Sequence, residues 1–153
     1  MPASSRRRIK PVVLSGVLPA LEGLLAEAPG RLIALAESRD FWDEDWTYEE
    51  VEALEEAMTV QFLRVEEHLT SVWGPPSFAG KLGSRGFPAW CPGMRLAYWQ
   101  RRERIAAVWW EHQDKEVPIL LIASAPPAKP RASGKARPTG GKQRIPRSPT
   151  RSR

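Results

Sequence analysis

The sequence predicts an α+β domain, in which N-terminal helices pack on a C-terminal antiparallel sheet of about three to four strands. Apolar residues recur at intervals of three and four positions in the first half of the chain, which is typical of helices that bury one face. Short apolar and aromatic runs separated by polar turns fill the second half, as in a meander of strands. With 153 residues, the chain has the length of one domain with a substantial core.

The first expected helix covers residues 15–28 and follows a flexible basic arm at residues 1–11. Its apolar residues share one helical face and are Leu14, Val17, Leu18, Leu21, Leu24, Leu25 and Ala28. Pro29 and Gly30 end this helix. The spacing of Leu32, Leu35 and Ala36 predicts a short second helix over residues 31–38.

The strongest local signal is a capping box that starts a long helix. Thr47 and Glu50 have the spacing at which each side chain can bind the other residue's backbone N–H. An apolar stripe follows at intervals of three and four residues, made of Val51, Leu54, Met58, Phe62, Val65, Leu69 and Val72. These features predict one amphipathic helix over residues 47–73, which the Gly74-Pro75-Pro76 sequence ends.

The expected strands lie in the second half of the chain, at residues 78–82, 94–100, 104–112 and 119–123. Tight polar turns separate the last three strands, which indicates an antiparallel meander with the long helix across one face. Two prolines after Ala125 mark the end of a domain that begins near residue 12.

The net charge of +5 conceals an acidic body with basic ends. Residues 126–153 contain no acid and almost no large apolar side chain, so we expect a disordered tail there. Its nine cationic residues predict weak, salt-dependent binding of polyanions, and they are Lys129, Arg131, Lys135, Arg137, Lys142, Arg144, Arg147, Arg151 and Arg153. The alternative is a solubilising extension that has no partner.

Cysteine content and hydropathy predict a cytoplasmic protein. Cys91 is the only cysteine, so no intrachain disulfide can form, and no apolar stretch has the length of about 18 residues that a transmembrane helix needs. The alternative is export, because Arg6, Arg7 and Arg8 precede an apolar run, and the small-x-small sequence at 26–28 resembles a cleavage site.

The sequence offers weak candidates for catalysis or metal binding. Cys91 with His112 and Asp114 has the residue types of a nucleophilic set, but no nucleophile signature surrounds the thiol, and a packed thiol is the expectation. The two histidines, His68 and His112, lack metal-ligand spacing. The acidic run after Asp40 lacks the glycine and the final glutamate of a calcium loop. We therefore expect no metal, no cofactor and no enzymatic activity.

An acidic and aromatic segment over residues 41–56 is the leading candidate for a binding site. Aromatic rings among clustered carboxylates are typical of a surface that binds a basic protein. The candidate partner-binding residues are Phe41, Trp42, Asp43, Glu44, Asp45, Trp46, Glu49, Glu52 and Glu56. The alternative is that Trp42 and Trp46 fill the seam between helix and sheet, while the acids form a solvated face.

A second candidate uses the aromatic residues of the strands to stack nucleobases. The aromatics are Tyr98, Trp99, Trp109 and Trp110, and the nearby cations are Arg95, Arg101, Arg102 and Arg104. A sheet face covered by helices, with ordinary turn charges, is the competing explanation of the same residues.

The order of elements and the acidic face resemble small bacterial proteins that serve as immunity proteins or secretion chaperones, although no motif carries the resemblance. It implies a non-enzymatic protein-interaction domain with a basic protein as its partner. The alternative is a nucleic-acid-associated protein that binds polyanions through its basic tail.

Overall fold

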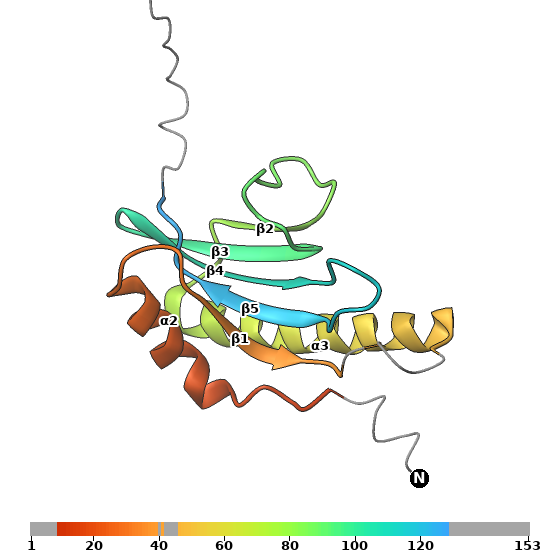
Figure 1. Cartoon of the computed structure of the whole chain (residues 1–153). Helices are drawn as coiled ribbons and strands as arrows, with labels where there is room; N and C mark the ends of the chain where they lie inside the picture. The colour runs from red at the N-terminus through yellow and green to blue at the C-terminus, as the bar shows by residue number, and fades with distance from the viewer. Residues whose placement is uncertain (1–8, 40, 42–45, 129–153) are drawn as a thin grey trace, which may run out of the picture.

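A single antiparallel sheet organises the chain, with its helices on one face (Figure 1). The computed structural model describes residues 9–39, 41 and 46–128. In chain order, the elements are η1 (Leu14–Gly16), α2 (Val17–Leu25), β1 (Leu32–Glu37), α3 (Tyr48–Trp73), β2 (Phe78–Lys81), β3 (Arg95–Arg101), β4 (Arg104–Glu111) and β5 (Leu120–Ser124). The five strands have the order β1-β5-β4-β3-β2, which confirms the predicted α+β class. None of the described helices combines the length and apolar composition needed to cross a membrane.

The prediction of a short helix over residues 31–38 is wrong, because this segment forms strand β1. β1 pairs with β5 in antiparallel register, with Leu32 opposite Ser124 and Ile33 opposite Ala123. A run of six residues is too short for its apolar spacing to distinguish a helix from a half-buried strand. Pairing satisfies the backbone groups along an edge of β5 that would otherwise be open. The sheet consequently has five strands rather than three or four.

The predicted capping box at the start of α3 is confirmed. The backbone N–H of Glu50 donates to the Thr47 hydroxyl at 3.1 Å, and the Thr47 N–H donates to the Glu50 carboxylate at 3.5 Å. Two of the four N–H groups that a helix start leaves without partners are thereby satisfied, and the acids of the first turn complement the helix dipole.

The apolar stripe of α3 packs against the sheet, apart from its last member. Its buried residues are Leu54, Met58, Phe62, Val65 and Leu69. Val72 is exposed, and Trp73 contributes to the core in its place, with its ring edge-on to Trp99 at 5.9 Å between centroids. The helix therefore has a fixed rotation, with one side held on the sheet and the other side facing solvent.

Arg104 at the start of β4 secures the end of α2. Its guanidinium donates to the carbonyl oxygens of Leu24 at 3.2 Å, Leu25 at 3.1 Å and Glu27 at 2.5 Å. The same side chain donates to the Ala125 carbonyl, just beyond β5. A cation that binds the last carbonyls of a helix also offsets the negative end of the helix dipole. One side chain thus joins α2 to two strands of the sheet.

The second face of the sheet is covered by the connection between β2 and β3, residues 82–94. Trp90 and Cys91 from this connection pack on Leu96, Trp109 and Ile122, which point away from the helices. The fit is close at Gly93, where an added Cβ would lie 2.6 Å from the Trp109 ring. Both faces of the central strands are consequently buried, and this second cover has no regular secondary structure.

Replacing Thr47 by Ala is expected to lower the free energy of unfolding by about 1 kcal/mol, because the N–H of Glu50 loses its acceptor. Urea unfolding followed by circular dichroism measures the change. Thr59→Ala is the matched control: its hydroxyl bonds back to the Glu55 carbonyl inside the helix, and its loss should cost little. Equal destabilisation by both variants would contradict the capping role.

Arg104→Ala is expected to lower the free energy of unfolding by about 2 kcal/mol, because several partly buried carbonyl groups lose a charged donor. Thermal unfolding measures the change. Arg85→Ala, which removes an exposed guanidinium from the 82–94 connection, is the control for the loss of a positive charge. A melting temperature unchanged by Arg104→Ala would show that water replaces the guanidinium without loss.

Candidate protein-interaction surface

Two of the three described aromatic residues of the predicted binding segment, Phe41 and Trp46, pack inward, as the alternative interpretation expected, whereas Tyr48 is 78% exposed. Phe41 is 6% exposed and contacts the half-buried Trp46 edge-on, with 4.7 Å between ring centroids. Phe41 also lies against His112, at 5.4 Å between centroids. These rings fill the seam between the start of α3 and the end of β4. Four other predicted partner-binding residues, Trp42, Asp43, Glu44 and Asp45, lie outside the described residues.

His112 is held by an acid of α3 in this seam. Its Nδ1 lies 2.9 Å from a carboxylate oxygen of Glu55, and its side chain is only 8% exposed. The other ring nitrogen, Nε2, is buried without a hydrogen-bond partner in the described part of the chain. The pair ties α3 to the end of β4, and sequence spacing gave no sign of it because 57 residues separate the partners.

The structure separates Cys91 from His112. Cys91 is buried in the small core under the 82–94 connection, whereas His112 pairs with a helix on the opposite face of the sheet. Burial raises the pKa of the Cys91 thiol to about 11, against the opposing effect of a 3.3 Å hydrogen bond from the Gly93 N–H. The thiol is therefore protonated at neutral pH, which confirms the expected packed cysteine.

The tryptophans of the strands do not form an open platform for nucleobases. Trp99 and Trp110 are buried under the helices, and Trp109 is buried under the 82–94 connection. Of the nearby arginines, Arg101 stacks on Trp73, with 4.7 Å from guanidinium to ring centroid. Packing thus explains the positions of these tryptophans. Their rings are not exposed for nucleobases to stack on.

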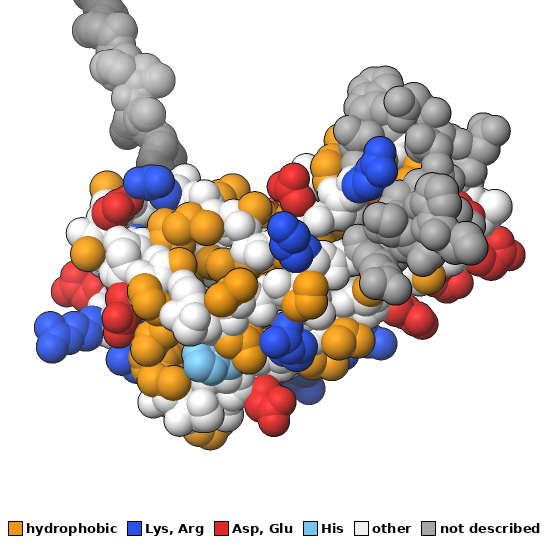
Figure 2. Space-filling model, turned by 90° about the horizontal axis from the view of Figure 1, so that it is seen from below, with side chains coloured by type: hydrophobic (Ala, Val, Ile, Leu, Met, Phe, Trp, Pro, Cys, Tyr) orange, Lys and Arg blue, Asp and Glu red, His pale blue; other side chains and the backbone are white. Residues whose placement is uncertain are grey.

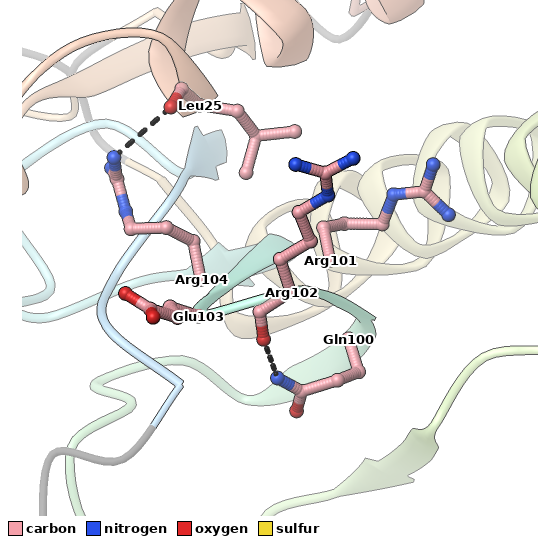
Figure 3. A pocket seen from close by; sticks show the side chains of 6 residues that line it. All are labelled: Leu25, Gln100, Arg101, Arg102, Glu103 and Arg104. Atoms are coloured by element: carbon pink, nitrogen blue, oxygen red, sulfur yellow. Dashed lines mark hydrogen bonds between the residues drawn. The ribbon is translucent and has the colours of Figure 1, made fainter.

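A hollow of about 710 Å³ lies at the β3–β4 turn, beside the end of α2. Figure 3 shows Arg104 directed toward the Leu25 carbonyl, while Arg101 extends away from it. Arg102 adopts a positive φ of 63°, and its carbonyl accepts a hydrogen bond from the Gln100 side chain. The guanidinium groups of Arg101 and Arg104 therefore have structural roles, on Trp73 and at the end of α2, and Arg102 contributes its backbone to the turn.

The glutamates of the predicted segment are exposed on α3. Glu49, Glu52 and Glu56 follow at intervals of three and four residues, so their carboxylates share the side of the helix that faces away from the sheet. We call these three residues the acidic face. Two large apolar side chains, Val60 and Leu63, continue this side of the helix and are also exposed.

A groove runs beside the acidic face, between α3 and the β2–β3 corner. It has a volume of about 490 Å³ and is lined by Glu52, Glu55, Glu56, Thr59, Lys81, Leu82, Met94, Arg95 and Trp110. Leu82 is 56% exposed and Met94 is also exposed, which places open apolar surface opposite the acids. The buried indole N–H of Trp110 has no acceptor among the described residues. The groove therefore has an acidic rim on α3, and on its other side Leu82 and Met94, which we call the apolar wall, lie beside the cations Lys81 and Arg95.

The sequence located the acids of this surface but not its apolar wall. Leu82 and Met94 are 12 positions apart in sequence, at the ends of two expected strands that a Gly- and Pro-rich connection joins. One signal of exposed apolar surface was present in the sequence. Val60 and Leu63 lie off the buried stripe of α3, so their side chains must face outward. Within residues 9–39, 41 and 46–128, no three His, Cys, Asp or Glu side chains converge closely enough to hold a metal ion.

Comparison of the chain with protein-family models, with curated proteins and with solved structures finds no match in any of the three. Any function therefore has to be inferred from the geometry of the chain itself.

Glu66, further along α3, lies in a separate hollow beside Gly80 and Arg95, and its ionisation leads to a prediction about pH. Burial raises the pKa of the Glu66 carboxyl above its usual value, and the nearby Arg95 only partly opposes this rise. The folded chain consequently binds this proton more tightly than the unfolded chain, so ionisation of Glu66 costs stability at neutral pH. Glu66→Gln is expected to raise the free energy of unfolding there, because an amide replaces the desolvated carboxylate.

This gain is expected to shrink as the pH falls through the raised pKa and to vanish below about pH 4, where the carboxyl is protonated in both states. Urea unfolding at several pH values measures it, and the exposed neighbour Glu67→Gln is the control. A stability difference that does not change with pH would mean that something other than the charge is responsible.

Proposed function

We propose that this protein is a non-enzymatic protein-interaction domain that binds a basic, partly apolar segment of another protein. The acidic face of α3 provides the charge, and the adjoining groove provides the apolar contact. The observation that carries the proposal is the exposure of Glu49, Glu52 and Glu56 on one side of a helix whose other side is fixed on the sheet.

Charge on this surface favours a cationic partner. The three carboxylates belong to a rigid helix, so they keep a constant spacing, and no side-chain hydrogen bond within the described residues occupies those of Glu49, Glu52 or Glu56. Clustered charge of one sign accelerates association with a partner of the opposite sign and selects against partners of the same sign.

The apolar wall provides binding energy that the charges alone cannot provide. Exposed charge pairs contribute little affinity, whereas desolvated apolar and aromatic contacts dominate the binding energy of protein interfaces. Leu82 and Met94 offer such contacts at the groove, and Val60 and Leu63 extend them along α3. A methionine adapts its shape to different side chains, which suits a binding surface. The partner segment should therefore alternate basic and apolar residues.

Binding of a labelled peptide that alternates Lys and Leu tests the proposal with the full chain. Reversal of the acidic face in the Glu49→Lys, Glu52→Lys, Glu56→Lys variant is expected to weaken binding at least about tenfold, because attraction becomes repulsion. Leu82→Ser with Met94→Ser should weaken binding while leaving its salt dependence unchanged, because these residues supply contact and not charge.

The matched control reverses three exposed acids elsewhere, Glu22, Glu103 and Glu116, and changes the net charge equally. Retention of binding by this control, with loss in the acidic-face variant, supports a specific surface. Equal loss in both variants would show that only overall charge matters and would overturn the proposal. Binding of a labelled oligonucleotide but not of the peptide would favour the alternative function, nucleic-acid association through the basic residues of 129–153.

A further inference from the structure

Three hydrogen-bond donors form one row across the sheet, on the face that packs against α3. Lys81 of β2 lies opposite Arg95 of β3, and Arg95 lies opposite Trp110 of β4. Residues directly opposite each other point to the same side of a sheet. All three side chains line the groove beside the acidic face. This row, which we call the donor row, therefore brings an ammonium, a guanidinium and an indole N–H together at one groove.

The described residues provide no acceptor for the donor row. The side chains of Lys81 and Arg95 form no ion pair and no hydrogen bond with them, although Arg95 is half-buried and lies near Glu66. Trp110 is 7% exposed, and its indole N–H is buried without a partner among the same residues. Two cations directly opposite each other repel, and a buried donor without an acceptor destabilises the fold. A bound anion would relieve both effects.

The carboxylates of α3 do not act as this anion. Glu52, Glu55 and Glu56 line the opposite side of the groove without an ion pair to either cation of the donor row. Glu55 is instead paired with His112, at 2.9 Å. Figure 2 views the helical side of the molecule from below, and acidic side chains lie at its right-hand end, where α3 begins in Figure 1. The groove thus separates a cationic row from an acidic rim.

A ligand that carries both charges fits this groove, with its anion toward the donor row and its cation toward the acidic rim. A carboxylate suits the donor row, because its two oxygens can accept two parallel hydrogen bonds from one guanidinium. The proposed partner segment alternates basic and apolar residues, so its side chains supply no carboxylate. A C-terminus does supply one, and capture of a terminal carboxylate is a recurrent mode of peptide recognition.

We propose that the groove binds the C-terminal carboxylate of its basic partner, an inference that rests on the proposed function. Lys81 and Arg95 donate to the carboxylate from two neighbouring strands. The indole N–H of Trp110 becomes a third donor when Met94 moves aside. Met94 lies beside Trp110, because its backbone N–H donates to the Trp110 carbonyl oxygen at 2.8 Å, and its exposed, unbranched side chain adapts readily.

This position of the carboxylate fixes the direction of the bound segment. An apolar last residue then contacts Leu82 and Met94, which line the groove together with the donor row. The basic residue before it points to the other side of the groove, because successive side chains of an extended segment alternate, and it meets Glu52 and Glu56. The partner is therefore a chain that ends in a basic residue followed by an apolar one.

Two forms of one peptide test the proposal with the full chain, by fluorescence anisotropy. The peptide alternates Lys and Leu, ends in Leu and carries its label at the N-terminus; one form has a free C-terminal carboxylate and the other a C-terminal amide. The free acid is expected to bind about tenfold more tightly, because charge-assisted hydrogen bonds hold its carboxylate. Overall charge predicts the opposite order, because the amide is the more cationic peptide. Equal affinities, or tighter binding of the amide, would overturn the proposal.

Arg95→Gln is expected to remove the preference, because it lowers the affinity for the free acid to that for the amide. Arg85→Gln removes an exposed guanidinium elsewhere and should leave the preference unchanged. A third peptide, the amide extended by one Glu, has the net charge of the free acid but only a side-chain carboxylate. If it binds as tightly as the free acid, the site does not recognise a terminus and the proposal fails. Circular dichroism verifies that each variant is folded.

The indole N–H resonance of Trp110 reports on the carboxylate directly. Comparison of the NMR spectrum of the full chain with that of Trp110→Phe identifies this resonance. The free acid should shift it downfield and the amide should not, because only the carboxylate accepts its hydrogen bond. N-acetyl-leucine and N-acetyl-leucinamide provide the same comparison without a peptide, so the donor row is tested even if peptide binding fails. The same spectrum with both compounds would contradict a carboxylate site.

The acidic-face variant separates this proposal from the proposed function. Reversal of Glu49, Glu52 and Glu56 should weaken the binding of both peptides and leave the preference for the free acid in place, because the donor row is intact. If this variant weakens both peptides but wild type binds them equally, the peptide-binding surface is supported and the terminal carboxylate site is overturned.

Discussion

The packing of the α3 stripe on the sheet is the contact on which the rest of the structure depends. Met58, Phe62 and Val65 are almost completely buried there, and a helix held along so much of its length cannot rotate. The opposite side of the helix must then face solvent, and that side carries the acidic face. Fixed rotation also sets the distance between the helix and the β2–β3 corner, and so creates the groove between them.

Burial on both sides of the sheet removes most of the aromatic residues from any binding role. Large rings stabilise a domain most when their whole surface leaves water, and a sheet covered on one face by helices and on the other by an irregular connection offers two such places. Trp99 and Trp110 occupy the first and Trp109 the second. What remains for the proposed recognition is a set of carboxylates, the exposed ring of Tyr48 and a few exposed apolar side chains.

The two edges of the sheet differ in length and in the surface that borders them. β2 is short and is followed by the connection that folds back over the sheet, whereas β1 is longer, uncharged at its centre and bordered by apolar surface. The acidic face and the β1 edge involve different elements.

Local interactions explain which features the sequence alone could predict. The Thr47–Glu50 box, the stripe of α3 and the prolines after Gly74 all act within a few residues, so the start, rotation and end of this helix follow from neighbouring side chains. The strands of the second half could also be predicted from the sequence, because polar turns separate them. The exposed acids of α3 could be found for the same reason, since the buried stripe assigns the opposite side of the helix to solvent.

Tertiary structure decided the features that need a partner distant in sequence. Residues 31–38 became a strand because β5, almost 90 positions away by its register, offers an edge that no local pattern reveals. The Glu55–His112 contact, the cover over Trp109 and the apolar wall of Leu82 and Met94 likewise arise only when the chain is folded. Helix propensity and capping are properties of a short segment, whereas strand pairing and the covering of a sheet face are properties of the whole chain, and only the folded chain determines them.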